Sequence, residues 1–493
     1  MMTLDLQRQD LLPGAQLIGA DWRGAGDGRR FDVSDPATGE AFASVPDGSA
    51  DDARAAVDAA AGAFPAWRAT PAKQRAAILK RWNDLLIAHQ EDLGRLISRE
   101  QGKPLAEGKG EVAYAASYVE WFAEEATRAN GEIIPAPVTG RRMMALREPV
   151  GVVAAITPWN FPAAMIARKI APALAAGCTV VCKPAEDTPL TSLALVRLAQ
   201  EAGVPAGVVN IVTASRERTP EVVDVWLADA RVRKISFTGS TAVGKHLARH
   251  SADTLKKLSL ELGGNAPFIV FDDADLDAAI DGVMAAKFRN GGQTCVSPNR
   301  IYVQEQVYEA FVAKLGARVA ALKVGPATDP ASQIGPMINA RAIAKIDQHV
   351  RDAVERGAKV VTGGRRLQGA GYAGSNYYAP TVLSEVNAEM ACSSEETFGP
   401  VAPVTRFATE EEVIAAANAT PFGLAAYFYS TDVRRIWRVT DALESGIVGV
   451  NEGALAAEAA PFGGVKESGY GREGSVHGLD DYLHLKYVCQ GQL

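Results

Sequence analysis

The middle of the chain alternates short, continuously apolar runs with stretches in which apolar residues recur at helical spacing. The predicted strands cover residues 152–156, 179–182, 208–212 and 234–237, and helical patterns occupy 163–176 and 189–202. Strands that are apolar at nearly every position are typical of a parallel sheet covered by helices on both faces. Ligands bind such sheets at the carboxyl ends of the strands, so we expect functional residues directly after these runs.

A second α/β pattern is predicted further along the chain, at roughly 300–450. It has a strand-like run at 300–303 and helical patterns near 305–322, 340–356 and 410–418. Two successive patterns of this kind predict two α/β sheets.

The N-terminal part is predicted to contain short strands followed by a helical scaffold. Strand-like residues 31–33 and 41–45 flank a turn, and helical patterns then run from 49 to 125 with breaks expected at prolines such as Pro65. Ser49 is followed by acidic residues, which is typical of a helix N-cap.

Two segments look extended rather than part of a core. Residues 131–150 contain prolines, glycines and two adjacent arginines, and predict a hairpin; an exposed loop is the alternative. The terminal segment 482–489 has a strand-like mixture of polar and apolar residues.

Composition narrows the class of protein. The chain has 493 residues, of which 47% are hydrophobic and 22% charged, as expected for a globular protein of about three domains. A net charge of −7 argues against a broad nucleic-acid surface. No apolar run approaches the roughly eighteen residues of a membrane span, and no targeting segment is recognisable, so we expect a cytoplasmic protein without membrane contact. The five cysteines lack the spacing of a disulfide framework.

Cys295 stands at the centre of the most informative stretch. A helical apolar pattern precedes it and should end near Asn290, after which Gly291 and Gly292 permit backbone conformations closed to other residues. This arrangement predicts a cysteine carried on a shaped turn. A free cysteine taken alone is more often a small, inert, buried residue.

Glu261 lies about thirty residues upstream and is followed by Leu-Gly-Gly-Asn. A thiolate that forms a covalent intermediate needs a second group that activates water to release it, and a carboxylate can do so. The Gly-Gln-Thr-Cys sequence ending at Cys295 and the Glu-Leu-Gly-Gly-Asn sequence resemble the nucleophile and general-base signatures of the NAD(P)-dependent aldehyde dehydrogenases. The resemblance covers nearly the whole chain.

This resemblance implies an α/β fold with two doubly wound parallel domains and a β-hairpin oligomerisation arm. Residues 1–130 and 151–260 would form the NAD-binding domain, 261–474 the catalytic domain, and 131–150 with 475–493 the arm. We therefore expect a homodimer or homotetramer. The implied reaction is aldehyde oxidation through a Cys295 thioester, with Glu261 as the base that activates water.

The resemblance also assigns residues that follow the predicted strands. Asn160 would hold the oxyanion together with the backbone N–H of Cys295, although asparagine also favours turns for structural reasons. The remaining assignments are to the nucleotide: Thr157, Trp159, Lys183, Glu186, Gly239, Ser240, Glu396 and Phe398.

Within these assignments, Lys183 and Glu186 match positions that contact the adenosine ribose. A carboxylate there accepts hydrogen bonds from the ribose hydroxyls and repels a 2′-phosphate. We therefore expect NAD as the cofactor, with NADP possible. Gly239 and Ser240 open a predicted helix whose N-terminus suits a pyrophosphate. Glu396 and Phe398 match positions beside the nicotinamide ribose and ring. The alternative is that the charged residues belong to solvated loops.

The chain most resembles the succinate-semialdehyde dehydrogenases, in which arginines matching Arg168 and Arg289 bind the substrate's carboxylate. Guanidinium groups pair with carboxylates through charge-assisted bonds, which would fix where the aldehyde end falls. A serine that completes this pocket in the family is replaced around Ala456 and Ala457. Glutarate semialdehyde, 2-oxoglutarate semialdehyde and uncharged aldehydes are therefore alternatives, and both arginines could instead be structural.

The residues present argue against four alternatives. A coenzyme A-acylating enzyme would use Cys295 but not need Glu261, and a non-catalytic relative would have lost the chemical residues. His246 and His250 have the spacing of a metal pair, but no carboxylate or cysteine cluster accompanies them, so no metal site is predicted. Ser297 stands where some relatives carry a second cysteine, so no local disulfide with Cys295 is expected.

Overall fold

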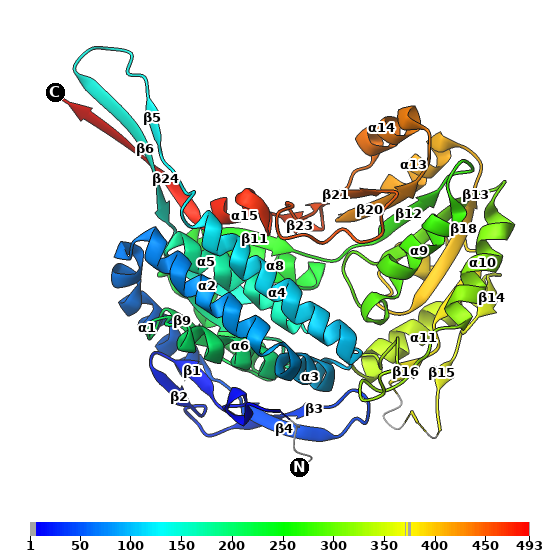
Figure 1. Cartoon of the computed structure of the whole chain (residues 1–493), viewed down its shortest axis with the longest axis horizontal. Coiled ribbons are helices and arrows are strands. Elements are labelled where there is room, and N and C mark those ends of the chain that lie inside the picture. Colours follow the sequence, from blue (N-terminus) through cyan, green and yellow to red (C-terminus); the bar gives the residue numbers. More distant parts are fainter. Residues whose placement is uncertain (1–5, 370, 373–375, 493) are drawn as a thin grey trace.

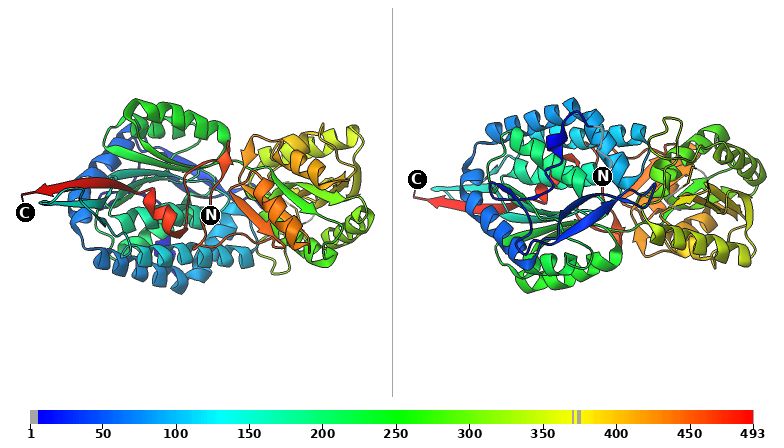
Figure 2. Two further views of the ribbon diagram at one scale, coloured as in Figure 1. Left: turned by 90° about the horizontal axis from the view of Figure 1, so that it is seen from above. Right: turned by 90° about the horizontal axis from the view of Figure 1, so that it is seen from below.

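The computed structural model describes residues 6–369, 371–372 and 376–492. Two large sheets form two lobes, and a narrow β arm projects from the first lobe and carries the C-terminal strand (Figure 1). Helices cover both faces of each large sheet (Figure 2). The two doubly wound α/β sheets predicted from the sequence are confirmed.

The first lobe is built on an eight-stranded sheet whose central strands are parallel. The antiparallel strands are at its edges. In sheet order the strands are β2 (Asp21–Arg23), β1 (Gln16–Ile18), β9 (Val209–Ile211), β8 (Thr179–Lys183), β7 (Val152–Ile156), β10 (Val232–Thr238), β11 (Lys257–Glu261) and β23 (Gly469–Tyr470). Every residue of β7 and β8 is buried, as continuous apolar runs predict.

Eight helices belong to this lobe in the part of the chain described. They are α1 (Ala50–Ala69), α2 (Ala72–Ala88), α3 (Gln90–Gln101), α4 (Leu105–Glu125), α5 (Pro162–Ala176), α6 (Pro189–Glu201), α7 (Thr219–Ala228) and α8 (Thr241–Ser251). Ser49 caps α1 through a capping box with Asp52, as predicted. The break expected at Pro65 is wrong, because α1 continues through this exposed position, where water can satisfy the carbonyl that the proline leaves unpaired.

The second lobe contains a seven-stranded sheet that is parallel except for β14 at its edge. In sheet order the strands are β14 (Lys359–Thr362), β17 (Thr381–Ser384), β18 (Val401–Phe407), β13 (Pro298–Gln304), β12 (Ala266–Val270), β20 (Ala425–Tyr429) and β21 (Ile447–Val450). Its helices are α9 (Leu276–Lys287), α10 (Tyr308–Ala320), α11 (Ala340–Glu355), α12 (Ala391–Ser394), α13 (Glu410–Asn418) and α14 (Val433–Ala442).

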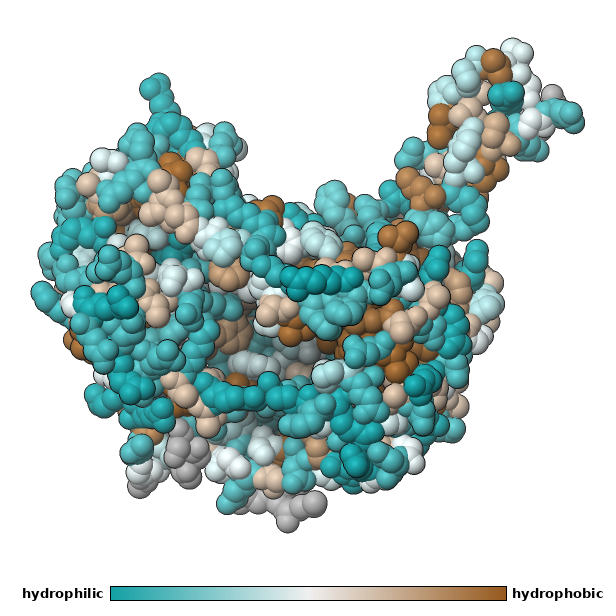
Figure 3. Space-filling model, turned by 180° about the vertical axis from the view of Figure 1, so that it is seen from behind, coloured by the Kyte–Doolittle hydropathy of each residue, from teal (hydrophilic) through white to brown (hydrophobic). Residues whose placement is uncertain are grey.

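The arm is a three-stranded antiparallel sheet made from two distant segments. Strand β6 (Arg141–Pro149) pairs with β5 (Glu132–Ile134) and, along its full length, with β24 (Leu483–Gly491). The extended hairpin and terminal strand predicted from the sequence are confirmed. Apolar side chains show on its surface (Figure 3), and Ile133, Leu485 and Tyr487 are exposed.

Short elements complete the fold. They are η1 (Gln9–Leu11), β3 (Arg30–Ser34), β4 (Ala41–Pro46), η2 (Ala252–Thr254), η3 (Arg289–Gly292), β15 (Arg366–Leu367), β16 (Tyr377–Tyr378), β19 (Phe422–Gly423), β22 (Val465–Lys466) and α15 (Ser475–Asp480). Within the described ranges, no helix combines the length and apolar character needed to cross a membrane.

Candidate active site

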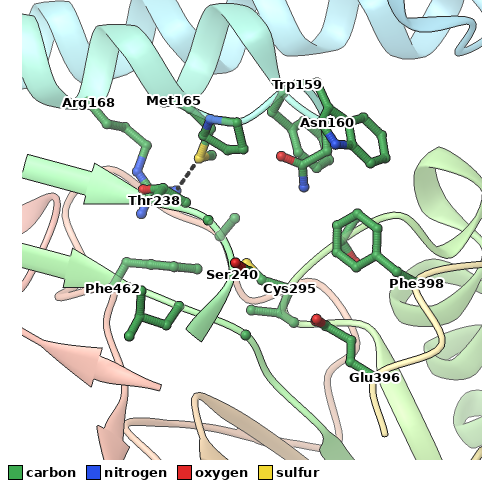
Figure 4. A pocket seen from close by; sticks show the side chains of 18 of the residues that line it. Trp159, Asn160, Met165, Arg168, Thr238, Ser240, Cys295, Glu396, Phe398 and Phe462 are labelled. Atoms are coloured by element: carbon green, nitrogen blue, oxygen red, sulfur yellow. Dashed lines mark hydrogen bonds between the residues drawn. The ribbon is translucent and has the colours of Figure 1, made fainter. Parts of the chain in front are cut away.

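A cavity of about 260 Å³ lies where the carboxyl ends of the first sheet face the second lobe. Figure 4 shows Trp159 and Asn160 above Cys295 and Glu396, with Phe398 at the side between them. The structure brings nine of the predicted site residues to its wall: Trp159, Asn160, Arg168, Gly239, Ser240, Arg289, Cys295, Glu396 and Phe398. Glu261 lies just behind this wall, whereas Thr157, Lys183 and Glu186 are not part of it.

The turn that carries Cys295 has the shape predicted for it. Helix α9 ends at Lys287, and Asn290, Gly291 and Gly292 then take positive φ values of 51°, 61° and 76°. A β-carbon at Gly264 would lie 2.3 Å from the carbonyl oxygen of Cys295, so only glycine permits this approach of the β11–β12 connection.

The Cys295 thiol is half-buried and is surrounded by more negative than positive charge. Burial, followed by the carboxylates of Glu396 and Glu261, raises its pKa to about 12, and the cation of Arg168 opposes this shift. The thiol therefore needs a base or a bound cationic group before it can act as a nucleophile at neutral pH.

Asn160 projects into the cavity from the loop between β7 and α5 (Figure 4). Its amide Nδ2 donates to the carbonyl of Gln293 at 3.0 Å, which ties it to the turn that carries Cys295. The backbone carbonyl of Asn160 accepts from Nδ2 of Asn290 at 3.0 Å and from Nζ of Lys103 at 2.8 Å. Asn160 and Cys295 line the same cavity, and an amide has a second N–H that can stabilise an oxyanion formed there.

Behind Asn160 lies a buried ion pair that the sequence did not reveal. Nζ of Lys103 is 2.6 Å from Oε2 of Glu111 and 3.9 Å from the ring centroid of Phe161. The other oxygen of Glu111 accepts the first backbone N–H groups of α5, from Ala163 at 2.8 Å and Ala164 at 3.3 Å. The pair therefore fixes the start of α5 and the loop that carries Asn160.

Glu261 occupies the last position of β11 and is buried, with Oε2 lacking a hydrogen-bond partner. Burial and the neighbouring carboxylate of Glu473 raise its pKa well above the usual range, while Arg168 and Lys169 oppose this shift. A carboxyl group with a raised pKa is a stronger base when ionised and is suited to general-base work.

Glu473 is a second residue that the sequence analysis missed. It forms a buried ion pair with Arg168, Nη2 to Oε2 at 2.9 Å, and another with Lys169, which also donates to Thr238. Although burial opposes it, Lys169 and Arg168 lower the pKa of Glu473, so this carboxylate is ionised. No motif signalled Glu473, because its partners on α5 come together with it only in the fold.

The two arginines predicted for the substrate both reach the cavity, in different environments. Arg168 is 2% exposed, and its guanidinium carbon lies 4.2 Å from the ring centroid of Phe462. Arg289 is exposed and lies 5.0 Å from the ring centroid of Phe161. The cavity thus carries two cations, one of which already has a carboxylate partner.

The opposite part of the cavity has features that fit a nicotinamide nucleotide. Ser240 caps α8, so backbone N–H groups of that helix terminus are directed at the space beside Gly239. Burial raises the pKa of Glu396 to about 7, and its Oε1 accepts the N–H of Gly264 at 3.3 Å. The ring of Phe398 packs edge-on against that of Trp159, with the ring centroids 5.5 Å apart.

Lys183 and Glu186 lie further along the same edge of the first sheet. They form an ion pair in which Nζ of Lys183 is 3.3 Å from Oε2 of Glu186. Thr157 follows β7, and its buried Oγ1 lacks a hydrogen-bond partner. These positions, with the start of α8, are those that a doubly wound sheet uses for a dinucleotide.

Histidines and cysteines elsewhere do not form a second centre. Across the described ranges, no group of three or more His, Cys, Asp or Glu side chains is placed to hold a metal ion. His246 and His250 are exposed, with ring centroids 4.1 Å apart. All five cysteines are described and free.

The fold and the cavity at the carboxyl edge of its first sheet are those of a nicotinamide-dependent oxidoreductase. The model of the aldehyde dehydrogenase family matches residues 22–488, and the chain belongs to that family. It is therefore an enzyme that acts on small aldehydes with NAD(P), and the resemblance noted in the sequence is confirmed.

Several relatives are similar over their whole length. A succinate-semialdehyde dehydrogenase from Escherichia coli (strain K12), named as NADP(+)-dependent, is 54% identical and covers 99% of this chain and 100% of its own. A glutarate-semialdehyde dehydrogenase from Pseudomonas putida is 53% identical, covering 99% of both chains. The crystal structure of succinate-semialdehyde dehydrogenase from Burkholderia pseudomallei has a TM-score of 0.96 at 53% identity, over 99% of this chain and 100% of that one.

Proposed function

We propose that this enzyme oxidises a semialdehyde acid to the dicarboxylate, with succinate semialdehyde as the first candidate substrate. The observation that carries this proposal is the pair of cations, Arg168 and Arg289, in the wall of the cavity that contains Cys295. One guanidinium fork can hold a terminal carboxylate while the aldehyde carbon meets the thiol. The succinate-semialdehyde dehydrogenases among the relatives agree with this assignment.

Glutarate semialdehyde is the second candidate, for two reasons. A relative of nearly equal similarity is named as a glutarate-semialdehyde dehydrogenase. In addition, Ala456 lines the cavity near the place where a serine was expected, and it offers no hydroxyl to a carboxylate. Loss of one hydroxyl partner costs about 1 kcal/mol, roughly fivefold, which weakens the preference for the shorter acid without abolishing it.

In the proposed mechanism, the Cys295 thiol loses its proton to solvent water, which the positive charge of a bound nicotinamide would favour, and the thiolate then attacks the aldehyde carbon and forms a tetrahedral adduct. The amide of Asn160 and the backbone N–H of Cys295 hold the resulting oxyanion. The bound nicotinamide supplies the hydride acceptor that lets the adduct become a thioester on Cys295. Asn160 and Cys295 belong to turns linked through the carbonyl of Gln293, which keeps these groups in register.

Glu261 completes the cycle by activating water. Its carboxylate takes a proton from a water molecule, whose oxygen attacks the thioester carbonyl. The C–S bond then breaks, and the proton held by Glu261 passes to the leaving sulfur, which releases the acid and the Cys295 thiol. The high pKa that burial and Glu473 give to Glu261 makes it a strong base in this position. A water route to product favours hydrolysis over transfer to coenzyme A.

The residues that would hold the nucleotide are those at the carboxyl edge of the first sheet. Gly239, Ser240 and the start of α8 suit the pyrophosphate, Lys183 and Glu186 the adenosine ribose, and Glu396 and Phe398 the nicotinamide side. Thr157 and Trp159 border this region.

We also propose that the arm joins subunits into a dimer or tetramer. Its exposed apolar residues Ile133, Leu485 and Tyr487 favour burial against a second copy. Sedimentation analysis of the wild type and of a chain lacking 483–493 tests this: a monomer at micromolar wild-type concentration contradicts it.

A kinetic panel tests the reaction. Succinate semialdehyde, glutarate semialdehyde, 2-oxoglutarate semialdehyde, butanal and benzaldehyde are each assayed with NAD and NADP. We expect the acids to exceed butanal in kcat/KM by on the order of a hundredfold. Equal values for butanal overturn the two-arginine pocket, and a rise in turnover on adding coenzyme A overturns the hydrolytic route.

A further inference from the structure

Arg216 contacts the carboxylate that the adenosine ribose is proposed to use. Its Nη2 lies 2.9 Å from Oε1 of Glu186, while Nζ of Lys183 lies 3.3 Å from the other oxygen, Oε2. Arg216 follows β9, and Lys183 ends β8, which is the neighbouring parallel strand. The two cations therefore approach Glu186 from adjacent strands at the edge where a doubly wound sheet binds its ligand.

The loop that carries Arg216 is anchored, although its side chain is about half exposed (51%). Asp47 accepts the N–H of Ser215 at 2.8 Å and the Ser215 hydroxyl at 3.1 Å, and Arg218 donates to the Asp47 carbonyl at 2.8 Å. The backbone is thus fixed on both sides of Arg216. Because the backbone is held in place, the long side chain of Arg216 can exchange one anionic partner for another without a change in the fold.

The charge beside the 2′ position of the adenosine ribose decides whether NAD or NADP binds better. A carboxylate that stands alone accepts the ribose hydroxyls and repels a 2′-phosphate, whereas a nearby arginine accommodates that phosphate. Here Glu186 is followed by a second carboxyl group, Asp187, and the two cations balance them. Without Arg216, a 2′-phosphate beside Glu186 would meet that carboxylate with Lys183 as its remaining ion-pair partner.

We propose that Arg216 is the residue that lets this enzyme accept NADP as well as NAD. Its guanidinium pairs with Glu186 when the ribose carries a free 2′-hydroxyl and with the phosphate when NADP is bound, while Lys183 keeps Glu186 in place. This inference rests on the proposed nucleotide site and adds a residue to the expectation, drawn from Glu186, that NAD is favoured with NADP possible.

The test compares Arg216→Ala with the wild type by calorimetric titration of NAD and NADP in the absence of aldehyde. We expect the ratio of the NADP to the NAD dissociation constant to rise by at least about tenfold, the size of one lost charge-assisted contact to a phosphate. Arg216→Lys should recover part of the loss, because it keeps the charge but not the fork. Arg249→Ala, which removes an exposed cation from the far end of α8, is the matched control and should leave the ratio unchanged.

Two results overturn the proposal: a wild type that does not bind NADP, or an Arg216→Ala variant with an unaltered ratio, whether both affinities stay the same or both weaken equally. Glu186→Gln provides an independent check, since it should shift the ratio toward NADP. These titrations need no aldehyde, so their outcome does not depend on which aldehyde the enzyme oxidises. If the panel fails and the ratio still changes as expected, only the substrate proposal is lost.

Discussion

Arg168 and Glu473 form a buried ion pair, with Nη2 2.9 Å from Oε2, directly behind the cavity that contains Cys295. The same guanidinium opposes the rise in the pKa of both Glu261 and Cys295. Arg168 is therefore more than a contact for the substrate's carboxylate, because it also compensates the acidic groups around the reacting centre. Arg289 is exposed and does not form an ion pair of this kind behind the cavity.

The two arginines should accordingly give different phenotypes. Arg289→Ala is expected to lower kcat/KM for a semialdehyde acid by on the order of a hundredfold, about 3 kcal/mol, and to change butanal oxidation little. Arg168→Ala should lower kcat/KM for both substrates and also lower the melting temperature, because Glu473 loses a buried partner. Steady-state kinetics and thermal unfolding measure this. An Arg168→Ala variant selective for acids, like Arg289→Ala, would show that its pairing with Glu473 is immaterial to catalysis.

Cys295→Ala should abolish aldehyde oxidation, since Cys295 is the only thiol among the described residues that line the cavity. Nucleotide binding should persist, because the thiol is not among the groups proposed to hold it. Rapid-mixing detection of NADH, with calorimetry for the nucleotide, separates the two effects. Cys392→Ala, which changes a thiol buried in the core of the second lobe, is the control and should keep the reaction. Wild-type turnover in Cys295→Ala would sink the assignment of the nucleophile.

Glu261→Gln should separate thioester formation from its hydrolysis. We expect about one equivalent of NADH per site in a fast phase, followed by turnover slowed by on the order of a hundredfold or more, because the amide cannot accept the proton from water. Mass spectrometry should find the acyl group on Cys295. Full multiple turnover without an accumulated acyl-enzyme would contradict this role.

The pH dependence of kcat follows from the same carboxyl group. The base works only when ionised, and its pKa is raised well above the usual range of a glutamate by burial and by Glu473, so activity should rise with increasing pH at values above that range. In Glu261→Gln the hydrolytic rate should lose this ascending limb. A wild-type kcat that is flat from pH 5 to pH 9 is the outcome that this argument does not allow.

Sequence patterns located much of this architecture, for reasons that are physical. The runs at β7 and β8 are apolar at nearly every position because both faces of the sheet are covered, and Gly291 and Gly292 mark positive φ values on the Cys295 turn. The helix break predicted at Pro65 was wrong, because a proline on an exposed helical face costs one hydrogen bond, which water can replace. Glu473 and Lys103 could not be found, since buried ion pairs join segments far apart in the chain and leave no local periodicity.

Lys103 offers the sharpest test of how the fold positions the site. Its ammonium group is the shared contact of the Asn160 carbonyl, the Glu111 carboxylate and the Phe161 ring. Glu111 in turn accepts the first N–H groups of α5. Removing the cation should let the loop that carries Asn160 shift, although Lys103 itself does not line the cavity.

Lys103→Met keeps the length of the side chain and removes its charge, and it should lower kcat on the order of tenfold, about 1.4 kcal/mol, with a smaller change in nucleotide affinity. It should also lower the melting temperature, because Glu111 is left buried without its partner. Lys103→Met combined with Glu111→Leu removes both charges and should recover part of the stability while kcat stays low. Stopped-flow kinetics and thermal unfolding of the single and double variants measure these effects, with Lys73→Met on the exposed face of α2 as control. If kcat returns together with stability in the double variant, Lys103 acts through folding alone and does not position Asn160.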